Sequence, residues 1–316
     1  MILGTRGSAL AMAQTEMVLH ALRQAAPSSS FTHRVIQTTG DLRQDLRLGR
    51  PESGADKGVW TKELEAALVE GTIQVAVHSA KDVPTDLPSG FRLAGCLPRA
   101  AVEDVLVSLR PGGLDALPSG ATVATSSVRR ACQLRHSRPD LRVNEIRGNV
   151  PTRLQKLAES ADLDALVLAR AGLDRLHYAS PWSASTAIPS VPLPAGLHAT
   201  LLPADRFLPA AAQGIVALEV FGEDTAREAL LAAITHAPTW RALRAERAFL
   251  RLLQAGCHTP IGMLTVEDSG CLRMQAMVFP EDPSAVDPPR TTQAAGSAGN
   301  PEAVALAAFE SLPPAR

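Results

Sequence analysis

The chain is poor in aromatic side chains: its 316 residues include three Trp, one Tyr and seven Phe. We therefore expect stacking on aromatic rings to be a minor part of ligand binding. An excess of one charge sign is also missing, because the formal net charge at pH 7 is −1. Such a balance gives no global attraction to nucleic acid or to an anionic membrane. Any binding of anions must come from local clusters of arginine or lysine.

Long apolar runs are absent too, and no segment approaches the ~18 residues that cross a bilayer. The segment 1–14 lacks the succession of basic, apolar and small residues that is typical of a signal peptide. Its pattern instead indicates a short strand that runs into a helix. These two observations lead us to expect a cytoplasmic protein without a membrane partner.

Cysteines are few, and the four present are Cys96, Cys132, Cys257 and Cys271. Their spacing matches no zinc motif, so no metal site is predicted. A disulfide framework is not expected in a cytosolic chain of this length. Each cysteine is first interpreted as a small buried hydrophobic residue.

The length exceeds what one ordinary core supports, so two or three domains are expected. Strand-like and helix-like segments alternate through the first two thirds of the chain, which favours an α/β fold with a largely parallel sheet. Strands are predicted at 2–5, 32–38, 73–77, 91–96, 105–109, 121–125, 143–146 and 165–169. Helices are predicted at 9–25, 61–70, 128–137 and 151–159.

Two segments are candidate crossings between lobes: 98–104, and a proline-rich surface excursion at 181–209. A strand at 214–220 would return the chain to the first lobe. The pattern then changes to a small α+β unit. Its helices are predicted at 240–254 and 303–312, its strands at 263–267 and 272–278, and a loose loop at 280–300. We expect α/β domains at 1–99 with 213–233 and at 100–212, followed by a C-terminal domain at 234–316.

The densest chemistry lies at 125–130, Thr-Ser-Ser-Val-Arg-Arg, where a predicted strand gives way to a helix. Free backbone N–H groups at a helix N-terminus bind anions, and paired arginines clamp carboxylates. The alternative is an ordinary N-cap with a solvated basic first turn. Arginine opposes the helix dipole there, which favours the anion site over the plain cap.

Two further junctions repeat this pattern: 147–153, Arg-Gly-Asn-Val-Pro-Thr-Arg, and 5–8, Thr-Arg-Gly-Ser. Each is equally compatible with an ordinary turn that carries surface charges. Together, three strand-to-helix junctions indicate a cleft for a ligand with many carboxylates. In open α/β sheets, ligands bind beyond the carboxyl ends of the strands, where all three junctions are predicted to lie.

Two single residues could carry chemistry. Asp82, beside Lys81 after a predicted strand, could pass protons or stabilise a cation, although a turn-forming aspartate is the plainer interpretation. Cys257 lies in a loop beside His258 and could be a nucleophile or a covalent attachment point. A buried thiol is the plainer interpretation there.

These segments together resemble the hydroxymethylbilane synthase (porphobilinogen deaminase) family, from residue 2 to about 265. Nine motifs occur in the family's order, and that order makes the resemblance specific. They are Gly-Thr-Arg-Gly-Ser at 4–8, Lys-Gly-Val-Trp-Thr-Lys-Glu-Leu-Glu at 57–65, His-Ser-Ala-Lys-Asp-Val-Pro at 78–84, Thr-Ser-Ser-Val-Arg-Arg at 125–130, Arg-Gly-Asn-Val-Pro-Thr-Arg at 147–153, Leu-Ala-Arg-Ala-Gly-Leu-Asp-Arg-Leu at 168–176, Ala-Ala-Gln-Gly-Ile at 211–215, Ala-Glu-Arg-Ala at 245–248 and Gly-Cys-His-Thr-Pro-Ile-Gly at 256–262.

The resemblance implies a transferase of tetrapyrrole and haem biosynthesis that acts as a monomer. Such an enzyme condenses four porphobilinogen molecules head to tail with release of ammonia, then releases hydroxymethylbilane by hydrolysis. A dipyrromethane cofactor, attached to the thiol at the position of Cys257, primes the growing chain. Asp82 matches the catalytic acid, which assists loss of ammonia and steadies the cationic azafulvene. Partners would be porphobilinogen and the growing polypyrrole, with no nucleic acid.

Family positions also match side chains around the ligand, whose rings each carry an acetate and a propionate. The implied cofactor-binding residues are Cys257, Ser79, Lys81, Asp82, Thr125, Ser127, Arg129, Arg130, Arg147 and Gly148. The implied substrate-binding residues are Arg6, Ser8, Lys57, Trp60, Arg153, Arg175 and Gln213.

The sequence departs from the family pattern in three places. Ala255 stands where many members have glycine, Ser53 where some have lysine, and 181–208 is longer than expected. Two other functions remain open. Two periplasmic-binding-protein-like α/β lobes joined by a double crossover, here with a small α+β domain, also suit a protein that closes on small anions. A cysteine-dependent hydrolase could use Cys257 and His258, although no third member of a triad is visible.

Overall fold

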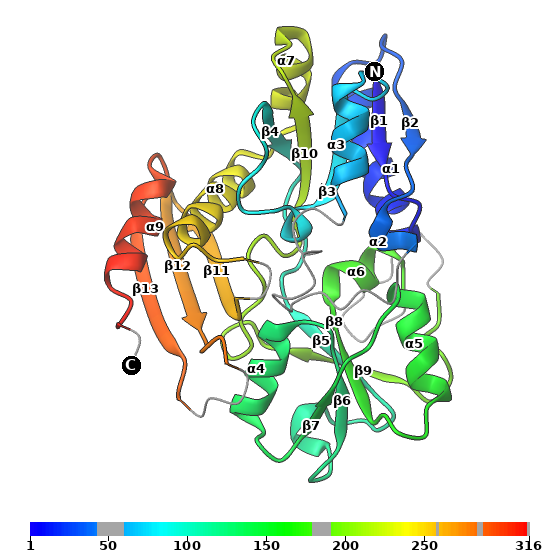
Figure 1. Ribbon diagram of the computed structural model, residues 1–316, viewed down its shortest axis with the longest axis vertical. Helices are drawn as coiled ribbons and strands as arrows, with labels where there is room; N and C mark the ends of the chain where they lie inside the picture. Colours follow the sequence, from blue (N-terminus) through cyan, green and yellow to red (C-terminus); the bar gives the residue numbers. More distant parts are fainter. Residues whose placement is uncertain (43–59, 179–190, 257–258, 283–286, 315–316) are drawn as a thin grey trace.

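The computed structural model describes residues 1–42, 60–178, 191–256, 259–282 and 287–314, and their strands form three sheets (Figure 1). Two five-stranded sheets form two α/β lobes, and a three-stranded sheet belongs to a smaller unit beside them. Within the described residues, no helix is both long and apolar enough to cross a membrane.

The first lobe has the strand order β2-β1-β3-β10-β4. Its strands are β1 Ile2–Thr5, β2 Thr32–Val35, β3 Val75–Ser79, β4 Phe91–Cys96 and β10 Val216–Phe221. Its helices are α1 Ala9–Ala25, α2 Thr39–Leu42, α3 Lys62–Val69 and α7 Thr225–Ile234. Side-chain alternation in β3 explains the layers: Val75 and Val77 belong to the core with α1 and α7, whereas Ala76 packs with α3 on the other face.

The second lobe has the strand order β7-β6-β8-β5-β9. Its strands are β5 Asp104–Ser108, β6 Thr122–Ala124, β7 Arg142–Asn144, β8 Ala165–Ala169 and β9 His198–Leu202. Its helices are α4 Val128–Ser137, α5 Val150–Glu159 and α6 Arg170–Arg175. Leu134 of α4 fills the core on one face, and Leu157 of α5 with Leu173 of α6 fills the core on the other.

Both lobe sheets are mixed, so the expectation of a largely parallel sheet is wrong in part. β10 runs antiparallel to β3 and β4, and β5 runs antiparallel to β8 and β9. Each of these strands is the first one that the chain forms after crossing from the other lobe. It enters from the side where the parallel strands end and therefore runs against them. Two crossovers result, at 97–103 and 203–215.

The C-terminal unit packs α8 Ala237–Leu252 and α9 Pro301–Glu310 on an antiparallel sheet (Figure 1). Its strands are β11 Ile261–Asp268, β12 Cys271–Val278 and β13 Arg290–Ser297. The loose loop predicted at 280–300 is wrong over β13. That strand is polar and lies at the sheet edge, where Thr292 is buried while its neighbours are partly or fully exposed, so apolar alternation could not reveal it.

The predicted fold class, two α/β lobes with a double crossover and a small α+β unit, is confirmed by this topology. Several predicted elements have the observed bounds, among them β1, α1 and β4. Most others are displaced by one to three residues. The excursion predicted at 181–209 contains β9, and its residues 181–190 lie outside the described part. The domain boundaries stay a prediction.

One buried carboxylate joins the crossovers to the C-terminal unit. The Glu246 side chain on α8 is fully buried and accepts hydrogen bonds from Arg99 Nη1 at 2.7 Å and Arg99 Nη2 at 3.2 Å. It also accepts the backbone N–H groups of Ala212 at 2.5 Å and Thr265 at 2.9 Å. Arg99 lies in the first crossover, Ala212 in the second and Thr265 in β11. The relative placement of all three segments therefore depends on this residue.

We expect Glu246→Ala to destabilise the protein by about 3–5 kcal/mol, because the buried Arg99 guanidinium and two backbone N–H groups lose their acceptor. The urea midpoint of unfolding measures this loss. Glu302→Ala is the matched control, since Glu302 pairs with Arg244 on α8 but both side chains are 47% exposed. That pair should be worth below about 1 kcal/mol. Equal midpoints for the two variants would contradict the role given to Glu246.

Candidate active site

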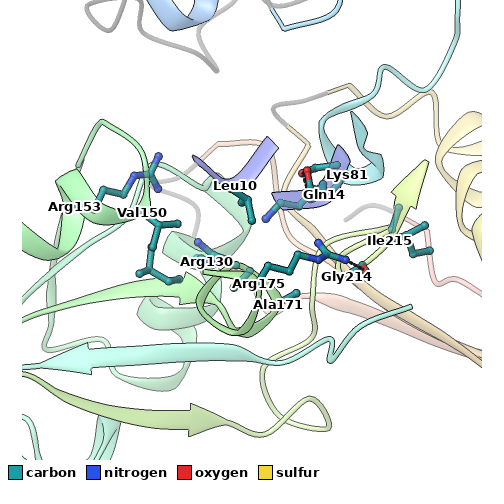
Figure 2. A pocket seen from close by; sticks show the side chains of 15 residues that line it. Leu10, Gln14, Lys81, Arg130, Val150, Arg153, Ala171, Arg175, Gly214 and Ile215 are labelled. Carbon is teal, nitrogen blue, oxygen red and sulfur yellow. Dashed lines mark hydrogen bonds between the residues drawn. The ribbon is translucent and has the colours of Figure 1, made fainter. Parts of the chain in front are cut away.

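A cavity lies between the two lobes, at the carboxyl ends of their parallel strands (Figure 2). The first lobe contributes side chains from α1 and from the end of β3, and the second lobe contributes side chains from α4, α5 and α6. The second crossover closes one wall. The lining residues are Leu10, Gln14, Ser79, Lys81, Arg130, Val150, Arg153, Leu168, Ala169, Ala171, Gly172, Arg175, Ala212, Gly214 and Ile215.

The lining contains four cationic side chains and, among the described residues, no carboxylate. Lys81, Arg130, Arg153 and Arg175 come from different walls of the cavity (Figure 2). Burial lowers the pKa of Arg153 and of Arg175 to about 10, and the nearby charges of Arg130 and Arg147 add to the effect on Arg153. Both guanidinium groups still carry charge at neutral pH. The cavity is therefore suited to a ligand with several negative charges.

Lys81 is the cation whose charge depends most on pH. Desolvation by the surrounding protein lowers the pKa of its amine to about 8, although the side chain is exposed to the solvent of the cleft. The negative charge of Asp82 opposes this shift, and the charge of Arg130 adds to it. Ser79, two residues earlier, exchanges hydrogen bonds with the side-chain amide of Gln14 on α1.

Asp104 at the start of β5 does not line the cavity but binds Arg130, which does. It is fully buried and accepts hydrogen bonds from Arg130 Nη2 at 2.7 Å and Gln213 Nε2 at 2.9 Å, and it forms an ion pair with Arg129 Nη2 at 2.8 Å. Burial alone would raise its pKa, but the charges of Arg129 and Arg130 hold that pKa well below the usual range. Sequence reasoning missed Asp104. The signal was an acidic residue at the start of a strand that is otherwise apolar.

The two arginines of the 125–130 junction consequently differ. Arg129 is 4% exposed, donates through Nη1 to the carbonyl oxygen of Leu208 at 2.6 Å and does not line the cavity. Arg130 reaches the lining, and its Nη1 donates to the carbonyl oxygen of Val167. Of the pair that the sequence interprets as a clamp, only Arg130 faces the ligand space.

The polar residues at the three junctions act as helix caps. Ser8 accepts the N–H of Ala11, and Ser127 accepts the N–H of Arg130. Asn149 caps α5 in the same way. Thr125 is buried, and its hydroxyl oxygen accepts the N–H of Ser127. The N-cap part of the alternative interpretation is therefore confirmed, whereas its solvated basic first turn is wrong, because Arg129 and Arg130 are buried. The roles of these polar residues toward a ligand stay predictions.

Other expected residues do not line the cavity, and most of them have partners of their own. Arg6 pairs with Asp41 at 2.5 Å, and its guanidinium lies 3.9 Å from the ring centroid of Trp60. Arg147 forms an ion pair with Glu145. Gly148 has φ +114°, where a side chain would be strained and would also meet Thr152. Lys57 and Ser53 lie outside the described residues.

Asp82 ends the 3-10 turn Ala80–Asp82 that follows β3, and its side chain is exposed. The turn is fixed to the second crossover, because the N–H of Ala80 donates to the carbonyl oxygen of Ile215 at 3.0 Å. Asp82 thus lies one residue from a cation that lines the cavity. Asp82 itself does not line the cavity, and its role as the reacting group stays a prediction.

The cysteines differ in accessibility. Cys257 and His258 lie outside the described residues. Cys96 is fully buried, and burial raises the pKa of its thiol to about 12. Cys132 and Cys271 are half-buried, so the prediction of a buried thiol is wrong for these two.

Two α/β lobes that meet around a cavity with four cations define a protein that handles small polyanions between its lobes. The family comparisons identify which one. Residues 1–229 match the model described as "Porphobilinogen deaminase, dipyromethane cofactor binding domain", and residues 240–308 match "Porphobilinogen deaminase, C-terminal domain". The chain belongs to the porphobilinogen deaminase family.

Relatives named porphobilinogen deaminase cover most of the chain. The protein of Moorella thermoacetica is 43% identical over 275 residues, which are 87% of this chain and 82% of that protein. The protein of Desulforudis audaxviator is 40% identical over 306 residues, 96% and 91% of the two chains. The predictions of the family, of a transferase and of a dipyrromethane cofactor are confirmed by these matches.

Solved structures that resemble the chain do so distantly. The periplasmic VFT2 domain of Bordetella pertussis BvgS gives a TM-score of 0.41 at 16% identity, covering 74% of this chain and 85% of that one. The aliphatic sulphonate binding protein SsuA of Escherichia coli gives 0.39 at 12% identity, covering 80% and 70%.

We expect the amine of Lys81 to titrate with a midpoint of about 8. The chain has four lysines, so reductive ¹³C-methylation and NMR can follow each of them, and the resonance missing from Lys81→Arg identifies Lys81. Because the amine is charged below the pKa, binding of a carboxylate ligand should weaken as pH rises through 8. A midpoint above 10, or no loss of binding between pH 7 and 9, would contradict this assignment.

Proposed function

We propose that this chain condenses four porphobilinogen molecules into a linear tetrapyrrole in the cavity between the lobes and then hydrolyses the product to hydroxymethylbilane. The observation that carries the proposal is a cavity with four cations and no described acid, directly beside the turn that bears Asp82. Each porphobilinogen ring brings two carboxylates, so the growing chain accumulates the charge that such a lining attracts.

The donors present fit the dipyrromethane group. Arg130 and Arg175 line the cavity, and the Nε atom of each is buried without a hydrogen-bond partner. Bidentate guanidinium donors are well matched to carboxylates. Cys257 is the thiol to which the cofactor would be attached. When bound, dipyrromethane supplies the electron-rich pyrrole carbon to which the first unit is added.

Asp82 is the residue that acts on the reacting unit. A carboxyl group one residue from the lining residue Lys81 can donate the proton on its oxygen atom to the departing amine. As a carboxylate it then stabilises the positive charge that develops on the ring of the incoming unit. The adjacent Lys81 has a different role: its positive charge binds the carboxylates of the ligand.

Of the remaining proposed residues, some contact the substrate and others hold the residues that do. Arg153 and Arg175 line the cavity and bind substrate carboxylates directly. Gln213 and Arg129 act from beneath, since both hold the Asp104 carboxylate that orients Arg130. Arg6 binds substrate by exchanging Asp41 for a ligand carboxylate, with the Trp60 ring keeping its guanidinium in place. Ser8, Ser79, Thr125, Ser127, Arg147, Gly148 and Lys57 complete the proposed set.

The proposal extends to organisation. The domains run from 1 to 99 with 213–233, from 100 to 212 and from 234 to 316. The pairing of β10 with β3 and β4 supports the discontinuous first domain. The protein works as a monomer in the cytoplasm, with porphobilinogen and the growing chain as its partners. The net charge of −1 supports the exclusion of nucleic acid.

The intact mass of the denatured protein should show the addition of two pyrrole units, and peptide mapping should place them on Cys257. Cys257→Ser should lack the adduct, whereas Cys132→Ser, which changes a half-buried thiol outside the site, should keep it. If the unmodified chain forms neither an adduct nor a tetrapyrrole after incubation with porphobilinogen, the protein is not a synthase. A binding protein for small anions would then be the better assignment.

Asp82→Asn should keep the adduct but lose turnover by a factor of about 10² to 10⁴, since the group that passes the proton is removed. Initial rates of hydroxymethylbilane formation measure the loss. Asp86→Asn is the matched control, because Asp86 lies four residues further along the same segment with its side chain 85% exposed. Turnover of Asp82→Asn within tenfold of the control would remove Asp82 from the central role.

A further inference from the structure

The segment that follows Asp82 is bonded to the C-terminal unit, far away in the sequence. Arg247 Nη2 on α8 donates to the carbonyl oxygens of Pro84 at 2.9 Å and Thr85 at 2.8 Å. In the opposite direction, the Thr85 hydroxyl donates to the carbonyl oxygen of Ala255 at 3.2 Å. Three hydrogen bonds thus connect the turn that carries Asp82 with the helix and loop that lead to Cys257.

Arg247 binds main-chain carbonyl oxygens, as Arg175 and Arg227 also do. Its residue is 7% exposed, and no carboxylate within the described part of the chain lies at ion-pair distance from it. Burial lowers the pKa of its guanidinium to about 10, so the group is still charged at neutral pH. A buried cation that uses main-chain carbonyls as acceptors fixes the backbone itself, not the rotamer of an acidic side chain.

The other end of the connection is also fixed. Ala255 is 6% exposed, and its N–H donates to the carbonyl oxygen of Leu250 near the end of α8 at 2.9 Å. The N–H of Gly256 donates to the hydroxyl of Thr259 at 3.2 Å. The backbone is therefore held up to the residue before Cys257, and Thr85 contacts this fixed backbone two residues before the thiol.

We infer that Thr85 and Arg247 are positioning residues that hold the Asp82 segment at the backbone of 255–256, which precedes Cys257 in the sequence. The inference rests on the proposed function, in which the growing chain is anchored at Cys257 while each new bond forms at Asp82. Asp82 follows β3 of the first lobe, whereas Cys257 follows α8 in the sequence, and the geometry at a reacting centre tolerates little displacement. Direct hydrogen bonds between residues 84–85 and the segment of Arg247 and Ala255 restrict the relative motion that the intervening residues would allow.

The inference predicts an effect that depends on chain length. For the first addition the anchored chain is short, so a shift of Asp82 relative to Cys257 directly misaligns the reacting atoms. Each later addition involves a chain with more rotatable bonds, which can absorb the same shift. Loss of the connection should therefore slow the first addition most.

Thr85→Val tests this, because it keeps the shape of the side chain and removes the hydroxyl donor. In the cofactor-bearing enzyme, we expect kcat to fall at least fivefold with KM for porphobilinogen within twofold. Thr85→Ser restores the donor and should recover kcat to within twofold of the unmodified enzyme. Quenched-flow samples analysed by intact mass should show the largest slowing at the first of the four additions. A kcat for Thr85→Val within twofold of normal, a Thr85→Ser as slow as Thr85→Val, or equal slowing of all four additions would overturn the inference.

A second pair of variants tests the helix side. Arg247→Gln should lower kcat in the same pattern, whereas Arg251→Gln should not. Arg251 lies one turn further on α8 and reaches the same segment only through a 3.5 Å ion pair with Asp86 that is largely exposed. If Arg247→Gln does not fold, the Thr85 variants decide the question alone. The unmodified chain run in parallel separates the two proposals: absence of tetrapyrrole from it refutes the proposed function, and normal turnover of Thr85→Val refutes only the positioning role.

Discussion

The relative placement of the two lobes and the C-terminal unit depends on two buried carboxylates that bind residues of the crossovers. Glu246 binds Arg99 of the first crossover and the N–H of Ala212 in the second. Asp104 binds the next residue, Gln213, together with the arginines of α4. A buried ion pair of this kind adds little stability over an apolar contact, but it tolerates no loss of either partner. Here the two carboxylates fix the position of the second crossover. Ala212 is bound to the C-terminal unit, and the adjacent Gln213 is bound to the second lobe.

The buried position of Asp104 has a direct electrostatic consequence for the cavity. Four cations around one space repel each other, and the lowered pKa values of Lys81 and Arg153 reflect burial together with such neighbours. The pKa of Arg175 is lowered by burial, against the opposing charge of Asp174. Asp104 offsets part of that repulsion from beneath without presenting an acid to the lining. The cavity can therefore concentrate positive charge while the carboxylate that balances it stays out of reach of the ligand. Ligand carboxylates supply the rest of the balance.

The sequence predicted where the cavity lies better than it predicted which side chains contact each other. Repeated strand-to-helix junctions located the cavity correctly, because parallel strands end at one edge of a sheet whatever their exact bounds. The same reasoning could not separate Arg129 from Arg130, since adjacent residues on a helix point in different directions and the acceptor, Asp104, is 25 residues earlier in the chain. It also missed β13, whose pairing with β12 comes from backbone hydrogen bonds that carry no apolar signature. Long-range partners of this kind are set by tertiary structure.

Fixing Asp82 to the C-terminal unit also constrains where a lengthening chain can be accommodated. The turn is bonded to the second crossover through Ala80 and Ile215, and its continuation is bonded to α8 through Arg247. The segment that bears Asp82 is thus attached to the same framework that Glu246 holds together. The walls that carry Arg153 and Arg175 belong to the second lobe, which meets this framework through Asp104, Gln213 and the bond from Arg175 to the carbonyl oxygen of Gly214. Displacing Asp82 to make space for added rings would therefore break the bonds that hold its segment to the second crossover and to α8.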